Sequence, residues 1–311
     1  MSGFTRKAAA AVVFGVAAAL LPAAGFSMQP VVDADWLAEH RDEVFVLQTS
    51  RSIDRFEGIG HIPDAPFIAM PDFLTTRETG SGTLKYLVPD ADAFARTMRR
   101  LGVGSDDRVI IAPAGTSLYN DTTVAARLYW QMRYYGHDKV AILDGGVAAW
   151  KAAGHPVSDQ PAEASERGSF RALDTRSALL RTTAEIEDVL ANSGLVSLLD
   201  NRPLVQYAGL AGRDYVNGLG HLRGAEPMPF DLFVTERDGV FFWRTPEQVQ
   251  RLFAALGEAN RPVITYCNSG HVSALAWFAL SEIGGVPEVS LYDGSLHEWT
   301  MESDRELVIG R

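Results

Sequence analysis

The only cysteine of the chain lies in the stretch Val263-Ile264-Thr265-Tyr266-Cys267-Asn268-Ser269-Gly270-His271-Val272-Ser273. The apolar, β-branched start of this stretch predicts a buried parallel strand, and Asn-Ser-Gly predicts a turn. The apolar segment Ala274–Leu280 follows directly and predicts a buried helix. Open α/β sheets bind their ligands at the carboxyl ends of strands. We therefore expect Cys267 to lie at a ligand-binding edge of a parallel sheet.

The loop after Cys267 predicts a site that stabilises negative charge. Backbone N–H groups of the loop and of the first helical turn lack partners within the helix, so they can converge on an anionic sulfur. Such surroundings favour the thiolate, which is the nucleophilic form of cysteine. The alternative is that Cys267 is a small buried hydrophobic residue, the commoner role of a lone cysteine. Its place at the strand end favours the nucleophile hypothesis.

The sequence contains an internal repeat, which bears directly on architecture. The segment Gly58–Ala65 begins Gly-Ile-Gly-His and returns as Gly218–Ala225, which begins Gly-Leu-Gly-His. The segment Ile142–Trp150 likewise returns as Leu291–Trp299. The repeat predicts two copies of one fold in tandem.

Short apolar strands alternate with amphipathic segments in each copy, a pattern that predicts a parallel sheet flanked by helices. The fold class is therefore α/β, with domains at residues 28–153 and 178–311 joined by a linker at 154–177. Pro113 aligns with Cys267, so we expect the first domain to be inactive. The strands are predicted at Val44–Leu47, Val109–Ala112, Val140–Leu143, Val196–Leu199, Val263–Tyr266 and Val289–Tyr292, and the helices at Asp92–Arg100, Thr122–Tyr135, Pro246–Leu256 and Ser273–Ile283.

Composition and the N-terminus narrow the function classes. The chain has 311 residues, of which 47% are hydrophobic and 22% charged, which is typical of a globular protein. Its net charge of -11 argues against a nucleic-acid partner, which needs a basic surface. The cysteine and the scattered histidines lack the spacing of a metal-ligand set, so we expect no metal site.

The first 27 residues predict a secretory signal peptide. Arg6 and Lys7 precede an uncharged run, Ala8–Leu21, which is followed by small residues where a signal peptidase could cut. We therefore expect export, to the periplasm of a bacterium, with no membrane span in the mature chain. The alternative is an uncleaved N-terminal anchor. Export permits disulfides, but a single cysteine cannot form one within the chain, which favours a working thiol over intermolecular pairing.

With these features, the chain resembles the tandem-domain rhodanese family of thiosulfate and 3-mercaptopyruvate sulfurtransferases. The resemblance covers nearly everything after the signal peptide and implies an inactive N-terminal domain and a catalytic C-terminal domain. It rests on Val32–His40, the two Gly-His segments, Leu198–Arg202, the Cys267 loop, Tyr292–Ser295 and Glu298–Trp299.

The resemblance also implies a mechanism. The Cys267 thiolate attacks the outer sulfur of a donor such as thiosulfate, sulfite leaves, and a persulfide remains on the cysteine. Cyanide or a thiol then takes that sulfur, so ping-pong kinetics are expected, and a protein can also serve as acceptor. The family needs no metal or organic cofactor. The persulfide and thiolate would be stabilised by backbone N–H groups of the loop residues Asn268, Ser269, Gly270, His271, Val272 and Ser273.

Two positions depart from the family pattern where a cation is often found. The Cys267 loop has no Arg or Lys, although His271 could act as a donor or as a pH-dependent cation. The alternative is that His271 only hydrogen-bonds the loop backbone or faces solvent. Gln206 stands where the family often has an Arg that reaches the donor's anionic end. Glutamine donates hydrogen bonds but carries no charge, so an anionic donor would bind weakly or the donor would differ.

Three further residues are candidate contacts of the active-site cleft. Arg202 could reach the cleft, or it could form a structural ion pair with Asp200. Ser295 differs from Gly146, its counterpart in the inactive half, which makes it a candidate cleft contact.

Two other function classes compete with the sulfurtransferase. Cysteine-dependent phosphatases and arsenate reductases also attack from a cysteine surrounded by backbone amides. They use an arginine at the end of the loop to bind a tetrahedral oxyanion, and here that residue is Ser273. The other class is a non-enzymatic module that carries sulfur or binds a protein. We expect the sulfurtransferase.

Overall fold

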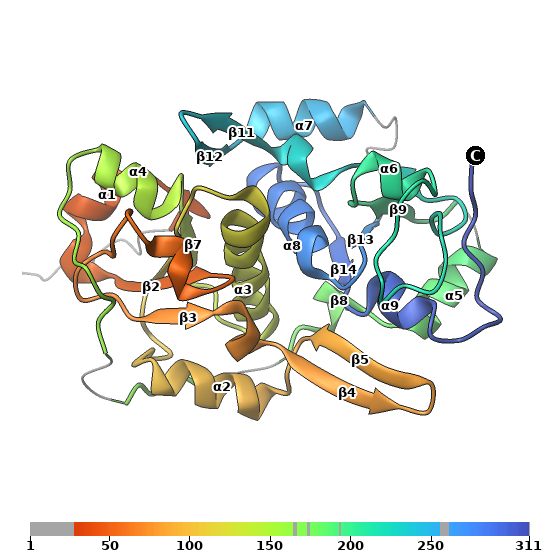
Figure 1. The fold of residues 1–311 in the computed structure, drawn as a ribbon, viewed down its shortest axis with the longest axis horizontal. Helices are drawn as coiled ribbons and strands as arrows, with labels where there is room; N and C mark the ends of the chain where they lie inside the picture. The colour runs from red at the N-terminus through yellow and green to blue at the C-terminus, as the bar shows by residue number, and fades with distance from the viewer. Residues whose placement is uncertain (1–27, 164–166, 173–174, 193, 256–260, 311) are drawn as a thin grey trace, which may run out of the picture.

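The computed structural model describes residues 28–163, 167–172, 175–192, 194–255 and 261–310. They form two halves, each built on a parallel five-stranded sheet flanked by helices (Figure 1). The sheet orders, β1-β7-β6-β2-β3 and β10-β9-β13-β14-β8, match when equivalent strands are compared. The sheet strands are β1 (Val31–Val32), β2 (Phe45–Ser50), β3 (Phe67–Ala69), β6 (Val109–Pro113), β7 (Val140–Leu143), β8 (Leu180–Arg181), β9 (Ser197–Asp200), β10 (Glu226–Pro227), β13 (Val263–Tyr266) and β14 (Val289–Tyr292).

The helices cover both faces of each sheet. In the first half α1 and α4 pack on one face and α2 and α3 on the other, and in the second half α5 and α9 face α7 and α8 in the same way. The α/β prediction of two tandem units is confirmed. The α-helices are α1 (Ala34–Glu39), α2 (Ala91–Arg100), α3 (Thr123–Tyr134), α4 (Gly146–Ala152), α5 (Thr183–Ala191), α6 (Leu204–Tyr207), α7 (Pro246–Ala254), α8 (His271–Phe278) and α9 (Ser295–Trp299).

One hydrophobic core runs through both halves. Helices α3 and α8 lie side by side between the two sheets (Figure 1), and their buried residues belong to a single cluster. Tyr129 of α3 meets Phe278 of α8 edge to face, with 4.6 Å between the ring centroids. Trp130 and Trp277 are almost fully buried in the same layer. Aromatic side chains bury large apolar areas, so this layer ties the halves together.

Two antiparallel hairpins that the sequence did not reveal reach across between the halves. They are β4 (Thr75–Thr79) with β5 (Gly82–Leu87), and β11 (Val234–Arg237) with β12 (Val240–Trp243). Just past the first hairpin, the Val88 N–H donates to Asp293 at 2.9 Å, and in the second the Trp243 N–H donates to Asp144 at 2.9 Å. Each half therefore supplies a backbone donor to the aspartate that follows a strand of the other half.

A buried ion pair also crosses between the halves. Arg127 of α3 pairs with Asp293, which follows β14, and their side chains are 1% and 6% exposed. Arg127 also donates to the carbonyl of Gly270 at 3.2 Å. The first half thus holds the backbone of the Cys267 loop in the second.

The element boundaries differ modestly from the predictions. The helix predicted at Thr122–Tyr135 begins after a π-helical turn, η4 (Leu118–Thr122). The helix predicted at Ser273–Ile283 begins two residues earlier, at His271, and ends in a second π-helical turn. Within the predicted linker, Phe170 is fully buried against Phe94 of the first half.

The predicted signal peptide, residues 1–27, lies outside the described residues. Among the described residues, no helix has the length and apolar character required to cross a bilayer.

Replacing Asp293 by Asn should destabilise the protein strongly, because Arg127 would be left as a buried charge without its counterion. Removing one partner of a buried pair costs about 3–5 kcal/mol. The free energy of unfolding, measured in urea, checks this. The control is Arg108→Ala, which removes a partly exposed ion pair with Glu43 and should cost at most about 1 kcal/mol. Equal losses in the two variants would contradict the structural role of the Arg127–Asp293 pair.

Candidate active site

Cys267 follows β13 at the carboxyl edge of the second sheet, as predicted, and is 2% exposed. It lies on a cavity of about 60 Å³. The first half contributes Tyr119, from η4, to the cavity wall. The second half contributes Pro203, Gln206, Arg213, Tyr215 and Phe230, and the Cys267 loop contributes Asn268, Ser269, His271 and Val272.

Gly270 gives the loop its shape. Its φ angle is +70°, in the left-handed region that glycine tolerates best, and it immediately precedes α8. A Cβ atom here would lie 2.5 Å from the carbonyl oxygen of Asp293 and 3.0 Å from the Arg127 guanidinium. The tight turn predicted from Asn-Ser-Gly therefore depends on close packing against both halves as well as on local sequence.

The sulfur of Cys267 has a hydroxyl beside it. Ser273, in the first turn of α8, donates from its Oγ to Sγ of Cys267 at 3.3 Å. Ser273 is fully buried. A hydrogen bond to sulfur stabilises the thiolate relative to the thiol. Ser273 occupies the place of the phosphatase arginine, and in this chain it contacts the sulfur of Cys267 directly.

Ser295 lies behind the loop and is not part of the cavity wall. Its hydroxyl accepts hydrogen bonds from the N–H groups of Cys267 and Gly270, each at 3.1 Å, and donates to the carbonyl of Tyr292 at 2.7 Å. The Gly270 N–H is therefore already engaged by a side chain. Ser295 fixes the loop backbone from behind.

His271 faces the first half. Its Nε2 lies 2.8 Å from the Thr123 hydroxyl and 3.3 Å from the Tyr119 carbonyl, which together favour a proton on Nε2. Burial lowers the pKa of His271 to about 3. The ring is neutral near physiological pH, so it does not supply the pH-dependent cation that the sequence left open.

Arg202 and Asp200 form a structural ion pair, one of the two alternatives drawn from the sequence. The Arg202 guanidinium donates to both oxygens of Asp200, at 2.5 Å to Oδ2, and to the Gly220 carbonyl at 2.7 Å. Tyr266 also donates to Asp200, at 2.9 Å. Both charged side chains are at most 2% exposed and neither lines the cavity. The pair, with Tyr266, therefore links the end of β9 to the end of β13, next to Cys267.

Gln206 does line the cavity, together with Asn268. The Asn268 amide donates to Oε1 of Gln206 at 2.9 Å, which joins α6 to the Cys267 loop. Oδ1 of Asn268 is buried and has no hydrogen-bond partner among the described residues. The two amides therefore form a polar, uncharged wall.

Sequence reasoning missed five residues of the cavity wall, namely Tyr119, Pro203, Arg213, Tyr215 and Phe230. Arg213 is exposed at the cavity, and its guanidinium lies over the ring of Tyr119, 5.7 Å from the centroid. It is the only Arg or Lys among the described residues that line this cavity. Tyr215 hydrogen-bonds to Ser269, and burial raises the pKa of Tyr215 to about 12, so its hydroxyl stays protonated.

One sequence signal could have pointed to Arg213 and Tyr215. The second copy has a longer segment between Tyr207 and His221 than the first has between Phe56 and His61. Both residues lie in that extra length. Tyr119 gave no such signal, because it comes from the half that lacks the cysteine.

The equivalent loop of the first half holds a carboxylate. Asp121 is fully buried and accepts from the N–H groups of Thr116 and Ser117 at 3.0 and 2.8 Å. It also accepts from Ser50 at 2.9 Å and pairs with Arg55 at 3.3 Å. These donors are satisfied by the protein's own anion, and Pro113 ends β6 where Cys267 follows β13.

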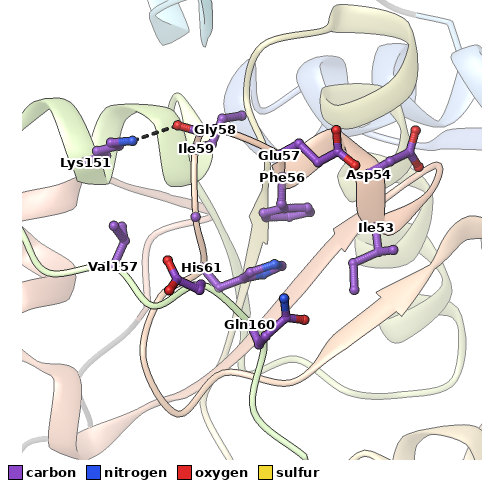
Figure 2. Close-up of a pocket in the computed structure, with 12 residues that line it drawn as sticks. Ile53, Asp54, Phe56, Glu57, Gly58, Ile59, His61, Lys151, Val157 and Gln160 are labelled. Carbon is purple, nitrogen blue, oxygen red and sulfur yellow. Dashed lines mark hydrogen bonds between the residues drawn. The ribbon is translucent and has the colours of Figure 1, made fainter.

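A further cavity in the first half, of about 350 Å³, lies beside His61 (Figure 2). Lys151 donates to the Gly58 carbonyl at its rim, at 2.7 Å. His61 stacks on Phe56 with 4.7 Å between centroids, and the repeat shows the same pairing between His221 and Tyr207. Both histidines therefore act in packing. No group of three or more potential metal ligands occurs among the described residues.

Comparison with known proteins shows that the chain is similar to sulfurtransferases. A family model described as "Rhodanese-like domain" matches residues 33–153 and 182–302. The chain is 34% identical over 248 residues to a thiosulfate sulfurtransferase of Bos taurus, which covers 77% of each chain. It is 30% identical over 288 residues to a 3-mercaptopyruvate sulfurtransferase of Escherichia coli strain K12, covering 88% of this chain and 95% of the relative.

A solved structure agrees with the sequence comparison. The crystal structure of SseA from Escherichia coli, described as a 3-mercaptopyruvate sulfotransferase with the rhodanese fold, superposes with a TM-score of 0.72. It shares 27% sequence identity, and the match covers 86% of this chain and 99% of that one.

Because His271 is neutral when folded, acid should destabilise the protein through this residue. Its pKa is about 3 in the folded chain, against 6.5 for an ordinary histidine. The stability that comes from keeping His271 neutral in the folded state is therefore fully present above about pH 6.5, and it is lost as the pH falls towards 3. When the pH is lowered from about 7 to about 5, the free energy of unfolding of the wild type should fall by about 2 kcal/mol more than that of His271→Gln. Urea unfolding at both pH values measures this, and identical pH dependence in the two proteins would contradict it.

Proposed function

The chain belongs to the rhodanese family and is an enzyme of the sulfurtransferase type, and from that premise we propose that it transfers a sulfane sulfur through a persulfide on Cys267. The donor is a small anion, thiosulfate or 3-mercaptopyruvate, and the acceptor is cyanide or a thiol. The observation that carries this proposal is a thiol at a strand's carboxyl end, on a small cavity, with the Ser273 hydroxyl 3.3 Å from its sulfur.

The reaction divides into two half-reactions. In the first, the Cys267 thiolate attacks the outer sulfur of thiosulfate, the S–S bond of the donor breaks, and sulfite leaves with the bonding electron pair. With 3-mercaptopyruvate the C–S bond breaks instead, and the leaving enolate takes a proton to become pyruvate. In the second, the acceptor attacks the outer persulfide sulfur, and Cys267 leaves as a thiolate. This division gives ping-pong kinetics.

The loop stabilises negative charge on both sulfur species. Ser273 donates to Cys267 Sγ. Helix α8 begins at His271, directly after the loop, so its first-turn N–H groups lack partners within the helix and the positive end of its dipole lies next to the loop. Ser295 and Arg127 hold the loop in this conformation from outside the cavity. The donors are fixed before the reaction begins, so little reorganisation is needed as charge moves onto sulfur.

Arg213 binds the anionic end of the donor. It supplies the positive charge that the Cys267 loop and Gln206 lack, and it lines the same cavity as the sulfur. Gln206 and Asn268 add uncharged hydrogen-bonding groups to the wall of the same cavity. The arginine that the family often carries at the place of Gln206 is thus replaced by one from the longer segment that follows.

We also propose that residues 1–27 direct export to a bacterial periplasm. Support comes from the charged start, the uncharged run and the small residues of this segment. A chain with one cysteine keeps its thiol free of internal disulfides in that oxidising compartment.

Intact-protein mass spectrometry tests the persulfide directly. Incubation with thiosulfate or 3-mercaptopyruvate should add one sulfur atom to Cys267, and cyanide should remove it. Cys267→Ser should gain no sulfur and lose all transfer, because a serine hydroxyl is far less nucleophilic at neutral pH. The same spectrum of exported protein shows whether residues 1–27 are removed. Full turnover by Cys267→Ser, or no sulfur gain by the wild type with either donor, would refute the mechanism.

Replacing Arg213 by Ala should raise the KM for thiosulfate roughly tenfold, because a charge-assisted hydrogen bond is worth about 1.5–3 kcal/mol and this one is partly solvated. The effect on kcat should be smaller. Steady-state kinetics with varied thiosulfate measure both. Arg223→Ala is the matched control, since Arg223 is exposed but does not line the cavity. Equal KM values for the two variants would show that Arg213 does not bind the donor.

A further inference from the structure

A second cavity opens beside the candidate active site, on the first half of the molecule. Its volume is about 440 Å³. Arg51 and Lys85 contribute charge to its wall, and Met70, Leu74 and Tyr86 contribute apolar surface. It is formed by residues that follow β2 and β3, together with residues of the β4–β5 hairpin.

Two contacts place this cavity next to the one at Cys267. The ring of Tyr86 meets the ring of Tyr215 with 5.8 Å between centroids, and Tyr215 belongs to the Cys267 cavity. The N–H of Arg51 donates to the carbonyl of Asn120 at 2.8 Å, and Asn120 follows Tyr119, another wall residue of the Cys267 cavity. The two cavities therefore adjoin through Tyr86, Tyr215 and the η4 segment.

The second cavity is positively charged. Its described wall contains Arg51 and Lys85 and no Asp or Glu. Both cations are exposed, and neither forms an ion pair with another described residue within 4.0 Å. In a chain of net charge -11, two unpaired cations on one concave surface favour an anionic ligand.

The sizes of the two cavities assign them different roles. The Cys267 cavity, at about 60 Å³, has room for the reacting end of a ligand only. The neighbouring cavity, at about 440 Å³, is within the range of roughly 300–1,000 Å³ that small-molecule sites occupy. A thiol acceptor larger than cyanide must leave most of its atoms outside the Cys267 cavity, and the adjoining space can accept them.

We propose that the Arg51–Lys85 cavity binds the body of the sulfur acceptor, and that this acceptor is a small thiol carrying carboxylate groups. The carboxylates lie against Arg51 and Lys85, and the thiol extends past Tyr215 to the Cys267 persulfide. The acceptor thiolate attacks the outer sulfur, a new S–S bond forms on the acceptor, the Cys267 Sγ–S bond breaks, and Cys267 leaves as a thiolate. The proposal deepens, and rests on, the persulfide mechanism above.

The kinetic test uses enzyme already loaded with sulfur by thiosulfate, so that only the second half-reaction is measured. Glutathione, which carries two carboxylates, is compared with 2-mercaptoethanol, which carries none. In the double variant Arg51→Ala, Lys85→Ala the KM for glutathione should rise at least tenfold. The rate with 2-mercaptoethanol, and the rate of loading measured at saturating thiosulfate, should change less than twofold. Arg100→Ala, which removes an exposed charge outside both cavities, should change none of these values.

A binding measurement keeps the inference independent of the chemistry. S-methylglutathione cannot accept sulfur, and isothermal titration should show that it binds the unloaded wild type and binds the double variant at least tenfold more weakly. Failure to load Cys267 would refute the persulfide mechanism alone, while this titration would still decide the acceptor site. No binding to the wild type, equal binding to both proteins, or an unchanged KM for glutathione would overturn the inference. The inference would also be overturned if the double variant lost sulfur transfer to a dithiol protein of the thioredoxin type while its transfer to glutathione was unchanged.

Discussion

The buried pair between Arg127 and Asp293 is the interaction on which the site most depends. It joins α3 of one half to the strand end of the other, and the same guanidinium donates to the Gly270 carbonyl at the turn of the Cys267 loop. A buried pair of this kind contributes little net stability, but it allows very few arrangements of the elements that carry it. The half without a cysteine is therefore a structural part of the candidate active site, and it also supplies Tyr119 to the cavity wall.

The two halves show how one fold can hold an anion in two ways. In the first half the loop after β6 binds the carboxylate of Asp121 with backbone N–H groups, a serine and an arginine. In the second, the loop after β13 carries a thiol and leaves a cavity beside it. The N–H groups of Thr116 and Ser117 are already engaged by Asp121, so placing a cysteine at Pro113 alone would not create a second sulfur site. The two halves therefore differ both in the Asp121 carboxylate that occupies the first loop and in the cysteine that only the second loop carries.

The sequence predicted local features well and long-range contacts poorly. The strand at Val263–Tyr266, the turn at Gly270 and the place of Cys267 follow from residue types adjacent in the chain, and the structure has them as expected. The cross-half roles of Arg127 and Asp293 could not be predicted, because they require knowing how α3 packs against the second sheet. His271 shows the same limit: its charge state is set by burial against Thr123, a residue far away in the sequence.

The distribution of charge concentrates cations at the two cavities of the candidate site. The chain as a whole is acidic, yet the exposed cations Arg213, Arg51 and Lys85 lie on two adjoining cavities. Concave surfaces with low-dielectric walls concentrate the field of such charges, so they attract anions locally despite a net charge of -11. A charged histidine in the loop would have made this attraction vary around neutrality, and because His271 is neutral there, the local field does not depend on its titration.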